Sequence, residues 1–231
     1  PLLPLSAFAG KRVAEIGSGT GRIVGMLLAA GAGQVVAVEP SQAVEVLRQN
    51  LKNDLHRVEI LHVRGDAIPP GLHLDFVVSI GVLHHIPDPA PVVSAVWKAL
   101  RPGGQFLIWV YGREGNRMVV FMIQSMRAIT THMPHWMLAS LASVCNVILD
   151  IYLPICRRLA FMPLADYVKN VIGKFGRKER YLVIYDQLKP AYAKYYTAHE
   201  VRSLLESGGF VDVTLYHRRQ YSWSATGRRP G

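Results

Sequence analysis

The sequence predicts an α/β protein built on a doubly wound, mostly parallel sheet. Two observations lead to this prediction. Short apolar runs alternate with amphipathic helical segments through the first 110 residues, and the first apolar run passes through a glycine-rich turn into a helix. The chain has 231 residues, of which 50% are hydrophobic, so it can bury an ample core. We therefore expect residues 1–231 to form a single domain.

The first strand and its turn lie at residues 13–22, which read VAEIGSGTGR. Gly17, Gly19 and Gly21 stand at alternate positions, and they allow the backbone to turn sharply and approach a ligand. The N–H groups at the start of the following helix would face that ligand. A dinucleotide site has the spacing G-x-G-x-x-G without a preceding acid, whereas Glu15 lies two residues before Gly17. A carboxylate there suits a cationic amine better than a pyrophosphate.

Three further strands are expected at residues 34–39, 58–63 and 75–80. Helices are expected over residues 21–30, from a Ser41 cap to about residue 53, and over residues 91–100. Because right-handed crossovers bring the carboxyl ends of parallel strands to one edge, a ligand crevice is expected there.

Several motifs together resemble those of the class I S-adenosylmethionine (SAM) methyltransferases. These motifs are acid-x-G-x-G-x-G at residues 15–21, LRPGGQF at 100–106 and TAHEVRSLLESGGF at 197–210. The resemblance covers residues 11–111, resumes at 197–213, and is greatest to the small-molecule branch of quinone- and sterol-type (type 11) enzymes. It implies a Rossmann-like sheet of seven strands with an antiparallel last strand, and SAM as the cofactor.

The resemblance also implies a set of cofactor-binding residues. Glu15 would meet the amino group of the methionine moiety, Glu39 the ribose, Asp66 with Ala67 the adenine, and Ile80 would offer backbone contacts. Glu39 lies about 20 residues past the glycine turn, where an acid in such folds binds ribose hydroxyls. The full expected set is Glu15, Gly17, Ser18, Gly19, Gly21, Glu39, Pro40, Asp66, Ala67 and Ile80.

Methyl transfer from SAM is a displacement at a sulfonium methyl group, so the protein must align the acceptor and exclude water. An oxygen acceptor often needs a general base. His84, near the exit of the fourth strand, and Tyr111, at the end of a fifth strand expected after the LRPGG motif, are the predicted catalytic residues, with His85 as a neighbouring alternative. The competing interpretation for each is simple packing. No His/Cys cluster has metal-ligand spacing, so no metal is expected.

The segment 113–194 is far longer than an ordinary crossover and is interpreted as a helical insertion. Residues 128–149 contain no Asp, Glu, Lys or Arg, while Pro134 and Pro154 are expected to break the apolar run. Three interpretations follow: a lid over the substrate mouth, a helix lying in a membrane interface, or a homodimerisation arm.

The net charge of +10 is unevenly distributed. Residues 1–110 contain 9 Lys and Arg against 8 Asp and Glu, whereas residues 111–231 contain 17 against 8. This asymmetry indicates an anionic partner such as a membrane surface, a phosphate-bearing substrate or a nucleic acid, or else a solvated basic surface. Two cysteines without metal or redox spacing, Cys145 and Cys156, favour a cytoplasmic location, with peripheral membrane contact through the insertion as a further expectation.

The leading functional interpretation is a SAM-dependent methyltransferase that acts on a small, lipophilic or lipid-linked acceptor. The alternatives are an RNA methyltransferase, which the basic second half suggests, and a non-catalytic SAM-binding partner subunit. Nucleic acid is the less favoured partner because no appended RNA-binding module is found. The acceptor atom stays open, as does N-terminal truncation, because the resembled family has helices before the first strand.

Overall fold

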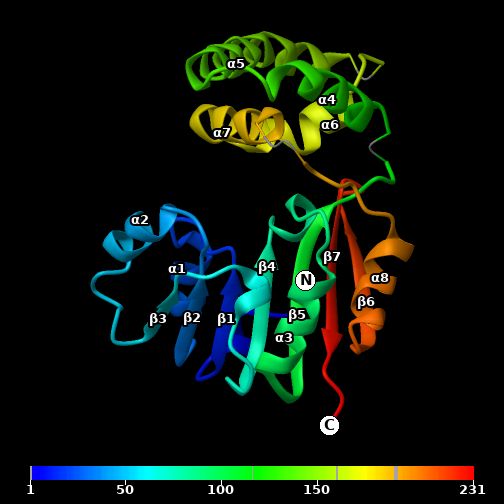
Figure 1. The fold of residues 1–231 in the computed structure, drawn as a ribbon. Coiled ribbons are helices and arrows are strands. Elements are labelled where there is room, and N and C mark those ends of the chain that lie inside the picture. The colour runs from blue at the N-terminus through cyan, green and yellow to red at the C-terminus, as the bar shows by residue number, and fades with distance from the viewer. Residues whose placement is uncertain (1, 116, 160, 190–191) are drawn as a thin grey trace. The chain divides into compact units, whose positions relative to one another are not determined.

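The computed structural model describes residues 2–115, 117–159, 161–189 and 192–231. The chain divides into two compact units (Figure 1). The first unit combines residues Pro1–Gly112 with Lys194–Gly231, and the second comprises Arg113–Ala193. The second unit lies in the chain where the sequence predicts the helical insertion.

The first unit is built on seven strands. They are β1 (Arg12–Ile16), β2 (Gln34–Val38), β3 (Val58–Leu61), β4 (Leu74–Ile80), β5 (Leu100–Tyr111), β6 (Val211–Arg218) and β7 (Ser222–Arg228). They form one sheet in the order β3-β2-β1-β4-β5-β7-β6 (Figure 1). The strands β1 to β5 pair in parallel, and β7 is antiparallel to both β5 and β6. This arrangement confirms the predicted seven-stranded, mostly parallel sheet with an antiparallel last strand.

Four α-helices and three short 3₁₀ turns complete the described part of this unit. They are α1 (Arg22–Ala29), α2 (Ala43–Asn50), α3 (Ala90–Ala99), α8 (Ala198–Ser207), η1 (Leu5–Phe8), η2 (Gly65–Ala67) and η3 (Leu83–His85). Helix α8 begins with a capping box. The Glu200 carboxylate accepts a hydrogen bond of 2.8 Å from the Thr197 amide, and the Thr197 hydroxyl accepts one of 3.2 Å from the Glu200 amide.

The predicted bounds of α2 are wrong at both ends. The helix begins at Ala43, and the Ser41 hydroxyl accepts a bond of 3.2 Å from the Ala43 amide in a turn before it. The helix ends at Asn50 rather than near residue 53, because residues 51–57 continue as hydrogen-bonded turns.

Alternating side chains of β1 reach two separate cores. Ala14 and Ile16 belong to the core that α3 and α8 cover through residues such as Val93 and Leu205. Val13 belongs to the core on the other face, which α1 and α2 cover. Both faces of the sheet are therefore closed, as expected for a buried parallel sheet. Because helices cover both faces, a ligand can reach the sheet only at the edge where the strands end.

All regular elements in the described part of the second unit are helices. Its elements are α4 (Arg117–Thr130), α5 (His135–Arg158), α6 (Ala165–Asn170), η4 (Ile172–Lys174) and α7 (Arg177–Leu188). The prediction that Pro154 breaks the apolar run is wrong, since α5 continues through it. Pro154 lies on the exposed side of the helix, where water can satisfy the carbonyl group that its missing N–H leaves without a donor. Pro134 does precede the helix, at its N-cap.

Many large apolar side chains of this unit are exposed. By length and composition alone, α5 could cross a membrane, and only 17% of its most apolar window is buried. Among the described residues, the buried core around Cys156, Ala165 and Val168 is small. The exposed apolar residues on α4 and α5 are Met118, Phe121, Met122, Ile129, Trp136, Met137, Val144, Val147, Ile148, Ile151 and Ile155.

Candidate functional site

The residues predicted to bind the cofactor lie at the carboxyl ends of neighbouring parallel strands. Glu15 is the penultimate residue of β1, and Glu39 directly follows β2. Asp66 lies in η2 after β3, while Ile80 and Tyr111 end β4 and β5. Because β1 to β5 are parallel, their carboxyl ends share one edge of the sheet (Figure 1), and the five residues lie there.

The glycine turn, residues 17–21, is fixed to the end of β2. The Gly17 and Ser18 amides donate to the Val38 carbonyl oxygen at 2.8 and 3.0 Å. Gly17 has φ +76°, and a Cβ atom there would lie 2.4 Å from a Val82 methyl carbon. Gly21, at the N-cap of α1 with φ +92°, would meet Leu47 in the same way. Glycine is thus required at both positions by conformation and by space.

Gly19 differs from its two neighbouring glycines. It has φ +53°, and a Cβ atom added there would contact nothing within 4 Å. The open side of the turn therefore lies at Gly19, where a ligand can approach the backbone closely.

Glu39 joins two loops through one carboxylate. Its Oε2 accepts a bond of 2.7 Å from the Gly19 amide, and its Oε1 accepts one of 2.9 Å from the Ser41 amide. Each carboxylate oxygen can accept a further hydrogen bond, so a hydroxyl-bearing ligand can still be bound. Next to it, the Pro40 carbonyl oxygen lies 3.2 Å from His62 Nε2, a contact that the sequence did not indicate.

The carboxyl group of Glu15 is buried, and one of its oxygens has no hydrogen-bond partner among the described residues. Its side chain is 2% exposed, and its Oε2 has no hydrogen-bond partner among the described residues. Burial raises the pKa of Glu15 to about 8, although the Val24 amide and the Arg22 guanidinium partly oppose that shift. A buried acid with one oxygen that lacks a hydrogen-bond partner is suited to a cationic ligand, which would supply both a donor and a charge.

Asp66 is held by a neighbour that the sequence analysis missed. Arg64 Nε donates to Asp66 Oδ1 at 3.1 Å, and Arg64 Nη2 donates to Oδ2 at 2.7 Å. Only the i, i+2 spacing of an arginine and an aspartate around Gly65 could have signalled this pair. The bidentate contact orients the carboxylate beside Ala67, whose amide donates to the Arg64 carbonyl oxygen at 3.0 Å.

His84 and Tyr111 lie together in a cluster of aromatic side chains. Their ring centroids are 3.8 Å apart at an interplanar angle of 32°, and His84 is fully buried. Trp109, which the sequence analysis did not single out, lies 5.9 Å from His84 edge-on, and Tyr195 stacks on Tyr111 at 5.4 Å. This burial favours the packing interpretation of His84, and its role as a base stays a prediction.

These features fit the predicted cofactor at two places. The partnerless oxygen of Glu15 suits an ammonium group, and the open side of Gly19 suits a close approach to the backbone. Among the described residues, no group of three or more His, Cys, Asp or Glu side chains could hold a metal ion.

The sheet order, the glycine turn and the strand-end carboxylates define the class I SAM-dependent methyltransferase fold. Residues 14–106 match the sequence family described as "Methyltransferase domain". Over these residues the chain is similar to methyltransferase domains, and the fold and the motifs support a class I methyltransferase with S-adenosylmethionine as its cofactor, as the sequence predicted.

Known proteins are similar to this chain over about half of its length. A tRNA U34 carboxymethyltransferase of Chromohalobacter salexigens is 34% identical over 124 residues, which are 51% of this chain and 37% of that protein. A ubiquinone biosynthesis O-methyltransferase of Aromatoleum aromaticum is 36% identical over 112 residues, 47% of each chain. The chain thus spans less than half the length of these relatives.

A solved structure shares the fold over the whole chain. The 1,6-didemethyltoxoflavin-N1-methyltransferase of Burkholderia thailandensis, solved with 1,6-didemethyltoxoflavin and S-adenosylhomocysteine, has a TM-score of 0.57. The match covers 100% of this chain and 78% of the other at 17% identity.

Proposed function

We propose that this chain transfers a methyl group from SAM to a small, lipophilic or lipid-linked acceptor. The observation that carries the proposal is the meeting of Glu15, Glu39 and Asp66 at one sheet edge beside the glycine turn. SAM, when bound, supplies an electrophilic methyl group on a sulfonium. The match of residues 14–106 to the methyltransferase family supports the reaction class.

The residues divide the work of binding in this proposal. Glu15 holds the amino group of the methionine moiety, and Glu39 takes the ribose hydroxyls while it orders the glycine turn. Asp66 and Ala67 hold the adenine, with Arg64 fixing the Asp66 carboxylate. Ser18, Pro40 and Ile80 complete the wall through their backbone, since each lies in a loop or strand end at this edge. The acceptor side is assigned to His84 and Tyr111, whose rings contact each other at a tilt where β4 and β5 end.

The lipophilic acceptor is inferred from the second unit. Exposing its apolar side chains to water costs free energy unless an apolar ligand or a membrane surface covers them. Basic residues accompany them, including Arg157, Arg158 and Lys174, so an anionic membrane surface is the proposed partner. The proposed location is the cytoplasm, at the periphery of a membrane.

An RNA acceptor is the second candidate. It is favoured by the relatives named as tRNA U34 carboxymethyltransferases and by the net charge of +10. Residues 111–231 carry most of that charge, with 17 Lys and Arg against 8 Asp and Glu.

One experiment separates the two candidates. The purified chain is incubated with SAM labelled on its methyl group and with either total lipid extract or bulk RNA. Label that enters the lipid fraction supports the proposal, and label that enters RNA supports the alternative. If calorimetry shows no binding of SAM or S-adenosylhomocysteine, the methyltransferase proposal itself is wrong.

A further inference from the structure

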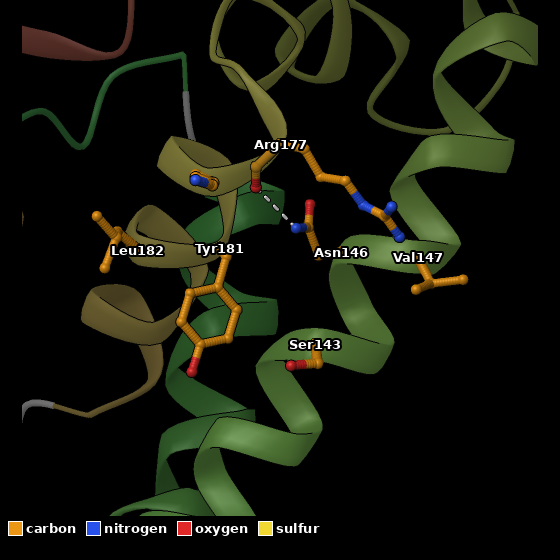
Figure 2. Close-up of a pocket in the computed structure, with 7 residues that line it drawn as sticks. Ser143, Asn146, Val147, Arg177, Tyr181 and Leu182 are labelled. Atoms are coloured by element: carbon orange, nitrogen blue, oxygen red, sulfur yellow. Dashed lines mark hydrogen bonds between the residues drawn. The ribbon is translucent and has the colours of Figure 1, made fainter.

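The second unit contains a ligand-sized pocket between α5 and α7 (Figure 2). Its volume is about 630 Å³, within the range of small-molecule sites. The residues that line it are Ser143, Asn146, Val147, Arg177, Lys178, Tyr181 and Leu182. All of them belong to the second unit, so the pocket shares no residue with the strand-end site of the first.

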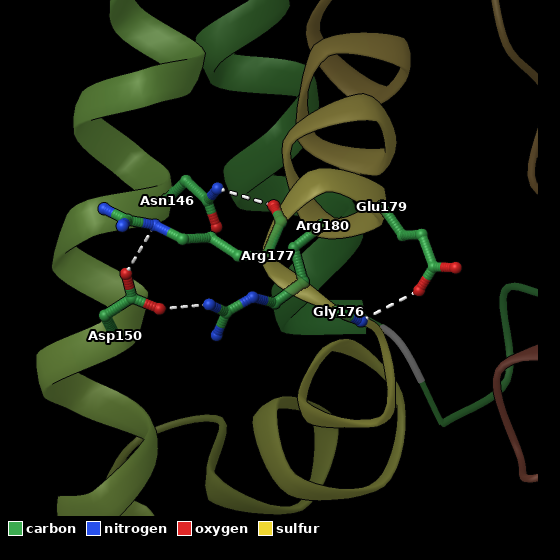
Figure 3. Close-up of polar contacts among 6 residues, drawn as sticks. All are labelled: Asn146, Asp150, Gly176, Arg177, Glu179 and Arg180. Atoms are coloured by element: carbon green, nitrogen blue, oxygen red, sulfur yellow. Dashed lines mark hydrogen bonds and ion pairs between the residues drawn. The ribbon is translucent and has the colours of Figure 1, made fainter.

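Polar contacts fix one end of this pocket (Figure 3). The Asp150 carboxylate pairs with Arg177 Nε at 3.0 Å and also with the buried Arg180. Asn146 Nδ2 donates to the Arg177 carbonyl oxygen at 2.8 Å. Because Asp150 and Asn146 come from α5 and both arginines from α7, these contacts hold the two helices together at the basic end.

Asn146 provides an unused hydrogen-bond acceptor in the pocket wall. The residue is 6% exposed, and its Oδ1 has no hydrogen-bond partner among the described residues. The Nδ2 contact with Arg177 determines which amide atom is the oxygen. A buried carbonyl oxygen of this kind needs a donor, and a ligand hydroxyl would supply one.

Apart from two uncharged polar residues, the pocket is lined by apolar or aromatic side chains and by two basic residues at the N-terminal end of α7. Val147 and Leu182 expose their side chains, and in the view of Figure 2 they lie on opposite sides of Tyr181, which also lines the pocket. Arg177 and Lys178 are exposed at the N-terminal end of α7. A guanidinium and an ammonium that line the same pocket as apolar side chains are complementary to an anionic amphiphile.

We propose that the pocket between α5 and α7 binds one acyl chain of a phosphatidylglycerol-type lipid. The chain would lie along Val147, Tyr181 and Leu182. The phosphate would meet Arg177 and Lys178, and a headgroup hydroxyl would donate to Asn146. This site is independent of methyl transfer, since it uses no residue of the strand-end site.

The test is calorimetric titration of the full chain with a monoacyl phosphatidylglycerol below its micelle concentration. Monoacyl phosphatidylcholine and glycerol 3-phosphate are titrated in parallel. We expect the anionic lipid to bind, the zwitterionic lipid to bind about fivefold more weakly because it lacks net charge, and glycerol 3-phosphate not to bind. Binding of SAM to the same preparation, measured separately, reports on the other unit.

Two matched pairs of variants locate the site. Val147→Gln should weaken binding about tenfold or more, because a valine-sized apolar contact is lost. Val144→Gln, on the same helix but outside the pocket, should leave binding unchanged, since its exposed fraction of 55% is close to the 47% of Val147. Lys178→Gln should weaken binding of the anionic lipid about fivefold, whereas Lys174→Gln should not.

Three outcomes would overturn the proposal. One is the absence of lipid binding to the unmodified chain. Another is an equal loss in Val144→Gln and Val147→Gln, which would indicate general adhesion to the apolar surface. The third is binding of glycerol 3-phosphate as tight as that of the lipid, which would indicate a free phosphate site. Thermal melting of each variant confirms that it is folded.

Discussion

The Glu39 carboxylate accepts a hydrogen bond of 2.7 Å from the amide of Gly19, twenty residues earlier in the chain. Its other oxygen accepts from Ser41 at 2.9 Å. One side chain thus orders both the glycine turn after β1 and the loop after β2. In the proposed function the same carboxylate also binds the ribose, so loop geometry and ligand binding depend on a single residue.

Removing this carboxylate should weaken cofactor binding. We expect Glu39→Ala to reduce the binding free energy of SAM by about 1–3 kcal/mol, the scale of lost charge-assisted hydrogen bonds. Calorimetry measures the change. Glu45→Ala, which removes an exposed acid from α2, is the matched control for net charge and should bind normally. Equal affinity in Glu39→Ala and the unmodified chain would refute the ribose assignment.

The open side of the glycine turn gives a second prediction. Gly19→Ala and Gly10→Ala both place a side chain at positive φ, +53° and +69°, with nothing within 4 Å of the new Cβ atom. Each should destabilise the fold by about 1–2 kcal/mol. Only Gly19→Ala should also lower SAM affinity, by about tenfold or more, because only that Cβ atom would occupy the ligand's space. Equal affinities in the two variants would place the ligand elsewhere.

The buried acid gives a prediction about pH. Burial raises the pKa of Glu15 from its ordinary value of 4.5 to about 8 in the folded chain. The folded state therefore binds a proton that the unfolded state releases between these values, and stability falls as pH rises from about 4.5 to about 8. Glutamine cannot ionise, so Glu15→Gln should gain stability relative to the unmodified chain between pH 5 and pH 8.

Denaturant unfolding without cofactor checks this prediction. The difference in unfolding free energy between the two proteins should be larger at pH 8 than at pH 5, because all other groups titrate alike in both. A difference that does not change with pH would show that Glu15 titrates near its ordinary value.

A single variant of His84 can separate its packing role from its predicted role in proton transfer. His84→Phe keeps a ring against Tyr111 but removes the nitrogen that could take a proton. If His84 acts as the predicted base, kcat at saturating substrate should fall about 10²-fold, with the SAM affinity unchanged. His217→Phe, which replaces a histidine stacked on Trp223 in β6 and β7, is the control. A rate within about threefold of the unmodified chain would leave His84 as a packing residue.

The strand-end residues could be predicted because local signals converge on them. The glycine turn, the apolar runs and the acids that end those runs are all visible within short windows of sequence. The antiparallel position of β7 between β5 and β6 has no such local signal, and it was predicted only through the resemblance to a family.

Other features depend on tertiary surroundings and could not be read from the sequence. The passage of α5 through Pro154 depends on exposure of that side of the helix. Likewise, the burial of Glu15 that raises its pKa depends on α1 covering the end of β1, which spacing alone does not show.

The exposed apolar side chains of the second unit give the last prediction. Trp136 is 70% exposed at the start of α5, and basic residues such as Arg157 and Arg158 lie at its other end. Apolar area with basic flanks is what an interfacial helix requires, and each basic residue near an anionic surface contributes on the order of 1 kcal/mol. We therefore expect the chain to float with anionic vesicles at low salt, and less with neutral vesicles or at high salt.

Trp136→Ser should reduce flotation because it removes a large exposed ring from the surface that would enter the interface. Tyr216→Ser, which removes a 50% exposed ring from β6 in the other unit, should float like the unmodified chain. If the chain does not float with anionic vesicles at low salt, or if both variants lose flotation equally, the proposed membrane contact is wrong. A lid over a soluble hydrophobic acceptor then explains the apolar surface better, because a lid needs the apolar side chains but not the basic flank.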